Sequence, residues 1–229
     1  YGHNYYKRSA DEAKTWSEQF ILTPHPGYGI VHNAKLRVLK SGRIIAPAEY
    51  KARWPNTRDH SGYVACVFYS DDRGYSWQRS RNVVDMDPNE AQEAHVVELK
   101  DGRLMMLFRT YSGYVGRACS TDKGETWSQG EIARDLAMSA NASAVTVDRI
   151  PSTGDLLLIR CTGGEEGRRT PLTCAISTDE GATWRYIRNL ADDPDDDYGY
   201  QSVTFVDDMA IISYHTRNGL HVARIGIGW

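Results

Sequence analysis

Four copies of one eight-residue pattern place the most severe constraint on how this chain can fold. The pattern is Ser-x-Asp-x-Gly-x-Thr/Ser-Trp, and its copies begin at residues 9, 70, 120 and 177. In the first copy Ala13 stands where the other three have glycine. Copies that recur after 61, 50 and 57 residues indicate a propeller, a solenoid or another array of similar units.

The chemistry of this pattern predicts a tight turn with a structural role. Asp and Ser side chains hydrogen-bond to nearby backbone, and glycine adopts positive φ without a steric penalty. The tryptophan that follows supplies a large apolar side chain to pack beneath the turn. We call each copy of the pattern an Asp box. We expect these boxes to mark turns between strands and to take no part in catalysis.

A second repeat lies between the boxes and predicts β-hairpins. Residues 39–45 and 99–105 each join two apolar runs through a turn that ends in Gly-Arg. The clearest unit is predicted to have strands at 93–99, 103–109, 114–120 and 127–132. Similar units are expected at about 30–84, 141–190 and 200–229, after the tail of an earlier unit at 1–22. The sequence thus predicts an all-β fold, a single β-propeller domain of four-stranded antiparallel blades that is incomplete at its N-terminus.

Composition excludes several classes of partner. A net charge of −3 over 229 residues suggests neither a nucleic-acid nor a membrane partner, and no run of 18 apolar residues is present. The four cysteines lie singly, so we expect core thiols and no zinc. The acidic run 192–197 resembles a calcium loop, although a solvated loop is the favoured interpretation. No metal or cofactor is therefore expected.

Blade topology predicts which edge carries a ligand site. The turn between the first two strands of a blade and the Asp box share one edge. The start of the first strand, the end of the second and the start of the third meet at the opposite edge. Polar side chains at these positions are His32, Asn33, Glu93, Asn141 and Tyr200, then Glu49, Arg109, Arg160 and His215, then Asp59, His60, Tyr114, Arg168, Arg169 and Asn218.

These residue types suggest recognition of an anionic ligand. Arginines that converge from several blades favour a carboxylate ligand, because the guanidinium group binds it with two hydrogen bonds. Tyr200 near Glu93 would be a phenol beside a base that takes its proton as it attacks. A neutral tyrosine nucleophile suits a substrate that is itself a carboxylate, since an Asp or Glu nucleophile would be repelled by it.

At this point the chain resembles the sialidase (neuraminidase) superfamily of six-bladed propellers. Residues 93–110 resemble the blade that carries the nucleophile's glutamate partner, here Glu93, and the second arginine of the carboxylate-binding triad, here Arg109. The segment 169–173 is similar to the one with the third arginine, so the resemblance implies Arg169, with Arg168 as the alternative. Residues 197–203 resemble the nucleophile segment, and we prefer Tyr200 to Tyr198 because it directly precedes the predicted strand.

The chain departs from the family pattern at its beginning. The family's first arginine and its aspartate acid/base precede the first box, but the eight residues before this chain's first box contain Arg8 and no Asp. We therefore expect an N-terminally incomplete sialidase-like protein. Residues 33–59 loosely resemble a family first blade, which makes Arg37 a candidate substrate-binding arginine and Asp59 a candidate acid/base.

Two functional hypotheses follow from this resemblance. The first is a retaining exo-glycosidase that removes terminal sialic acid or a related acidic sugar through a tyrosyl intermediate. The second is a non-catalytic propeller that binds glycans or proteins, since the acid/base and the first arginine are not identified. The family implies a secreted or periplasmic location and a sialoglycan or other acidic glycan as partner. An open ring of blades would also expose strand edges, so association of two copies is expected.

Overall fold

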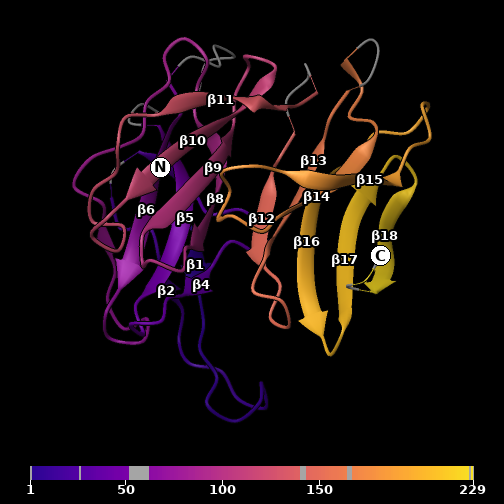
Figure 1. The fold of residues 1–229 in the computed structure, drawn as a ribbon. Helices are drawn as coiled ribbons and strands as arrows, with labels where there is room; N and C mark the ends of the chain where they lie inside the picture. Colours follow the sequence, from indigo (N-terminus) through magenta and orange to yellow (C-terminus); the bar gives the residue numbers. More distant parts are fainter. Residues whose placement is uncertain are drawn as a thin grey trace.

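A computed structural model describes residues 2–25, 27–51, 62–139, 143–163, 167–226 and 228. Its strands form antiparallel sheets that follow one another in chain order, from the indigo N-terminal strands to the yellow C-terminal sheet (Figure 1). Among the described residues, no helix is long and apolar enough to cross a membrane.

The first two strands, β1 (Tyr5–Tyr6) and β2 (Phe20–Ile21), form a short pair around the first Asp box. The first blade contains β3 (Tyr28–Ile30), β4 (Arg37–Val38), β5 (Ile44–Lys51), β6 (Val64–Ser70) and β7 (Gln78–Arg79). The second contains β8 (Gln92–Glu98), β9 (Leu104–Arg109), β10 (Tyr114–Ser120) and β11 (Glu131–Ala137).

The third blade contains β12 (Thr146–Arg149), β13 (Leu156–Cys161), β14 (Leu172–Ser177) and β15 (Arg185–Ala191). The fourth contains three strands, β16 (Gly199–Val206), β17 (Met209–Thr216) and β18 (Gly219–Gly226). The inner parts of successive blades contact one another in chain order, with β8 between β5 and β12, and β12 beside β16. The prediction of an all-β, partial propeller of antiparallel blades is therefore confirmed.

The predicted turns at the Asp boxes are present. In the box at 120–127, Asp122 Oδ1 accepts hydrogen bonds from Ser120 Oγ at 2.8 Å and Thr126 N at 2.9 Å. Asp122 Oδ2 accepts from Thr126 Oγ1 at 2.6 Å, and Gly124 donates its N–H to Ser120 Oγ with a φ of 89°. One carboxylate thus closes the whole turn.

The first box closes in the same way despite its alanine. Asp11 accepts from Thr15 Oγ1 at 2.6 Å and Ser9 Oγ at 2.7 Å, and these bonds, chiefly those from Thr15, lower the pKa of Asp11 to about 2. Ala13 has a φ of 64°, the left-handed conformation that the other boxes assign to glycine. The hydrogen bonds of the box therefore hold an unfavourable backbone conformation at this position.

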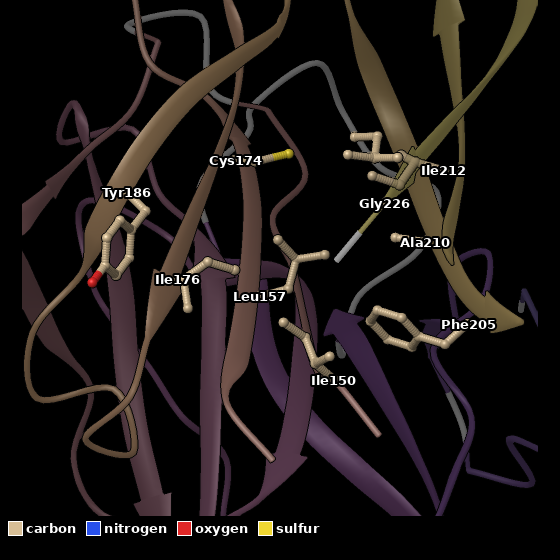
Figure 2. A pocket seen from close by; sticks show the side chains of 10 residues that line it. Ile150, Leu157, Cys174, Ile176, Tyr186, Phe205, Ala210, Ile212 and Gly226 are labelled. Atoms are coloured by element: carbon tan, nitrogen blue, oxygen red, sulfur yellow. The ribbon is translucent and has the colours of Figure 1, made fainter. Parts of the chain in front are cut away.

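The box tryptophans fill the spaces between successive blades. Trp127 belongs to the apolar core between the first and second blades, and Trp184 packs on the core between the second and third. Among described residues, the core between the third and fourth blades contains no tryptophan. An apolar cavity of about 40 Å³, partly open to solvent, lies there instead, with Ala210 and Ile212 facing Leu157 across it (Figure 2).

Two predicted strands needed correction. In the second blade the outer strand was expected at 127–132 but forms at Glu131–Ala137, because Trp127 turns into the core and is only 5% exposed. In the unit predicted at about 30–84, the inner strand is not continuous but is split into β3 and β4 by residues 31–36. The remaining strands of the second blade lie within one residue of their predicted positions.

Replacement of Ala13 by glycine is expected to stabilise the fold. Relief of a left-handed alanine outweighs the extra entropy of glycine in the unfolded chain, so Ala13→Gly should raise the free energy of unfolding by about 1 kcal/mol. Urea denaturation measures this change. The matched control is Ala182→Gly in the fourth box, where φ is negative, and this substitution should lower stability slightly. Equal effects of the two substitutions would contradict the argument.

Filling the cavity between the third and fourth blades is also expected to stabilise the chain. Ala210→Leu places three more carbon atoms against the apolar lining and should raise the free energy of unfolding by about 1 kcal/mol. The control is Ala118→Leu, because Ala118 is 2% exposed in the core that already holds Trp127, and overpacking there should cost roughly 1–3 kcal/mol. Thermal unfolding of both variants tests the contrast; a loss of stability in Ala210→Leu would refute it.

Candidate active site

Glu93 and Tyr200 occupy equivalent places at the starts of innermost strands β8 and β16. The register of β8 against β9 shifts between Gln92 and His95, and that of β16 against β17 shifts between Gly199 and Ser202. Both residues lie within these bulges, and both have a φ of 50°. Bulges re-aim side chains near functional sites, and a left-handed non-glycine residue persists only where its surroundings hold it.

Glu93 is buried and forms an ion pair within its own blade. Its side chain is 5% exposed, and Oε1 accepts a hydrogen bond from Arg109 Nη1 at 3.0 Å. Arg109 Nη2 also donates to the hydroxyl of Tyr111 at 3.2 Å. Glu93 Oε2 and Arg109 Nε are buried without hydrogen-bond partners. The pair thus presents one uncommitted carboxylate oxygen and one uncommitted guanidinium N–H.

Tyr200 is 44% exposed and lies beside Arg169. The Arg169 guanidinium carbon is 5.9 Å from the centre of the Tyr200 ring. A Cβ on Gly199 would lie 3.4 Å from Arg169 Nη1, so the arginine side chain packs across that glycine. Arg169 Nε is buried without a partner. The described side chains of Tyr200 and Glu93 form no hydrogen bond with each other. Hydrogen bonds between catalytic groups often shorten only when substrate binds.

The two alternative residues point elsewhere. Arg168 donates to Asp195 Oδ1 at 2.7 Å and to the carbonyl of Pro194, on the acidic loop. Tyr198 is 4% exposed, and its hydroxyl accepts the N–H of Asp193 at 3.1 Å. Burial raises the pKa of this phenol. Arg169 and Tyr200 are therefore better placed for a ligand.

Other predicted residues do not join this group. Arg37 is engaged elsewhere, because its Nη2 lies 2.9 Å from Asp148 Oδ2 and from His95 Nε2. Arg160 is buried and donates to the carbonyl of Ala137 on outer strand β11. Asp59 and Asn141 lie outside the described residues. No cluster of metal-ligating side chains occurs in the part of the chain that the structure describes.

Sequence analysis missed Lys35, a buried amine close to the axis. Lys35 is 2% exposed, and its Nζ donates to the carbonyl of Val145 at 3.1 Å. Burial lowers its pKa to about 7, against the opposing effect of the Glu93 carboxylate and with a smaller contribution from Arg37. The only sequence signal is that Lys35 lies four positions before Leu39, so that in a continuous strand both side chains would point to the same face.

Comparison with known proteins places the chain among sialidase-like propellers. A family model described as a BNR repeat-like domain matches residues 1–212. A sialidase of Bacteroides fragilis (strain YCH46) is 28% identical over 224 residues, which cover 89% of this chain and 37% of the relative.

Solved structures show the same fold. The intramolecular trans-sialidase from Ruminococcus gnavus, in complex with oseltamivir carboxylate, aligns with a TM-score of 0.77 and 24% identity over 97% of this chain and 50% of that one. A Trypanosoma rangeli sialidase with 2,3-difluorosialic acid, a covalent intermediate, aligns with a TM-score of 0.65 and 17% identity over 99% and 38%. The chain spans about a third to a half of the length of the relatives it matches.

The buried amine makes stability depend on pH in a defined direction. The pKa of Lys35 is about 7 in the folded chain and 10.5 ordinarily. Between these values the unfolded chain binds more protons, so this residue makes stability rise with pH over that window. Lys35→Met should therefore raise the free energy of unfolding by roughly 2–4 kcal/mol at pH 6.5, with the gain shrinking toward pH 10.

Urea denaturation of both proteins at about pH 6.5, 8 and 9.5 spans this window and measures the difference in the free energy of unfolding. The control is Lys40→Met, because Lys40 is exposed and its replacement should have a small effect at every pH. A gain for Lys35→Met that does not change with pH would show that Lys35 is not held as predicted.

Proposed function

Because this chain belongs to the BNR repeat-like family of sialidase-like β-propellers, we propose that it carries the tyrosine and carboxylate-binding side of a sialidase-type site. Its substrate class is a terminal sialic acid or a related acidic sugar. The observation that carries the proposal is the equivalent bulged position of Glu93 and Tyr200, each with an arginine beside it. Distant sialidase relatives support the same substrate class.

The proposed reaction divides roles among four side chains. Tyr200 Oη attacks the anomeric carbon, and its proton passes to the uncommitted Oε2 of Glu93. The bond to the leaving-group oxygen breaks, and water later hydrolyses the tyrosyl adduct with retention of configuration. Arg109 and Arg169 bind the sugar carboxylate through guanidinium N–H groups.

The charge of the substrate explains why a tyrosine suits this position. A carboxylate nucleophile would lie close to the carboxylate of the sugar, and like charges at short range repel strongly in a partly buried site. A neutral phenol avoids this repulsion, and Glu93 would act as the general base that takes the phenol proton during the attack. The proton for a sugar leaving group requires an acid, for which Asp59 remains the sequence-based candidate.

A fluoride leaving group separates the tyrosine step from that acid, because fluoride departs without a proton. Incubation with 2,3-difluorosialic acid is expected to form a bond from Tyr200 Oη to the anomeric carbon as the carbon–fluorine bond breaks. The phenol proton passes to Glu93, and the protein gains the mass of one fluorosialyl group. Intact-protein mass spectrometry followed by peptide mapping should locate this group on Tyr200.

Matched variants make the result specific. Tyr200→Phe should abolish labelling, whereas Tyr198→Phe should retain it. Arg169→Lys should raise the reagent concentration needed for half-maximal labelling by about tenfold or more, because a bidentate contact is lost, while Arg168→Lys should not. An unlabelled wild type that still binds sialic acid, measured by saturation-transfer NMR, would favour a binding propeller over an enzyme.

A further inference from the structure

The inner strand of the first blade carries a larger bulge than its neighbours. Ile30 pairs with Glu49, and Arg37 pairs with Ile45. Seven positions on the inner strand therefore span four on β5, and residues 31–36 are displaced from the ladder. We call residues 31–36 the axial bulge. Ala34 within it has a φ of 53°, close to the 50° of Glu93 and Tyr200.

The axial bulge reaches Tyr200 in the fourth blade. Asn33 Nδ2 donates to the backbone carbonyl of Tyr200 at 3.0 Å. Tyr200 lies where the ladder between β16 and β17 is interrupted, so this carbonyl is in an irregular part of the strand. A side chain separated from it by 167 positions in the sequence thus binds the backbone of the proposed nucleophile.

The first blade also contacts Glu93, which lies in the second blade. The N–H of Glu93 donates to Glu49 Oε2 at 3.3 Å, and His32 Nε2 lies 3.3 Å from that oxygen. Glu49 is 7% exposed. The Glu93 N–H is hydrogen-bonded to this buried carboxylate, whereas His32 Nε2 lies within ion-pair distance of it and forms no hydrogen bond among the described residues. These contacts run from Tyr200 through Asn33 and His32, which are adjacent in sequence, to Glu49 and Glu93.

Both contacts fix the backbone of a residue in a left-handed conformation. A non-glycine residue in the left-handed region is strained and persists only where other contacts fix it. Asn33 and Glu49 each bind the backbone of one such residue, and both come from the first blade. Their joint effect is to fix the position of the phenol relative to the carboxylate that would take its proton.

We propose that Asn33 and Glu49, with His32 behind Glu49, are positioning residues that hold Tyr200 and Glu93 in register across the axis. This inference rests on the proposed function for its chemical consequence. A displacement of about 1 Å between reacting groups reduces rates by about 100-fold. The contacts therefore predict a defect in the rate of the tyrosine step and little change in ligand affinity.

Two variants and one rescue test the inference through labelling by 2,3-difluorosialic acid. Asn33→Ala and Glu49→Ala should each lower the labelling rate at saturating reagent by about 10- to 100-fold, with half-saturation changed less than about threefold. Glu49→Gln keeps an oxygen acceptor for the Glu93 N–H and should recover most of the rate. Glu131→Ala, at an exposed ion pair with Arg117, should label like the wild type.

A second measurement does not require activity. Amide hydrogen exchange at Glu93, followed by NMR, should become at least about tenfold faster in Glu49→Ala than in the wild type, because the N–H loses its buried acceptor. Unchanged exchange in Glu49→Ala, or labelling at the wild-type rate in both alanine variants, would overturn the positioning role. A wild type that is not labelled at all would instead overturn the proposed function, and the exchange result would still decide whether Glu49 holds Glu93.

Discussion

The carboxylate at the centre of each Asp box is the interaction on which the rest of this structure depends. It binds a serine on one side and a threonine or serine on the other, and so closes the turn between the third and fourth strands of a blade. In the second and third blades the turn directs a tryptophan between its own blade and the preceding one. The box thereby contributes to the apolar contact between these successive sheets.

Polar and charged side chains from different blades meet along the inner strands. Innermost strands converge at the axis, and their bulges place Glu93, Tyr200 and the axial bulge at one level. Lys35 bonds to Val145 of the third blade, and Arg37 bonds to Asp148 on β12. Polar and charged side chains therefore replace the tryptophans as the contacts between blades at the centre of the arc.

Sequence predicted the outer architecture better than the axis, for a physical reason. Box turns and hairpins are local, because an Asp and a Thr four positions apart fix them, so their positions were predicted closely. The strand edges that bear Glu93, Arg109 and Tyr200 followed from the topology. Bulges depend on contacts between distant strands, so the split of the first inner strand and the contact of Asn33 with Tyr200 left no signal in the chain.

Several departures from ordinary folding rules coincide at Glu93. Orphaned polar atoms alone do not mark a site, since the indole N–H groups of Trp77 and Trp127 are also buried without partners. Those tryptophans are uncharged and gain from apolar contacts. At Glu93, a left-handed backbone, a buried charge and an unpartnered oxygen coincide. No apolar gain offsets these costs, and sites that break several local rules at once are those where function outweighs stability.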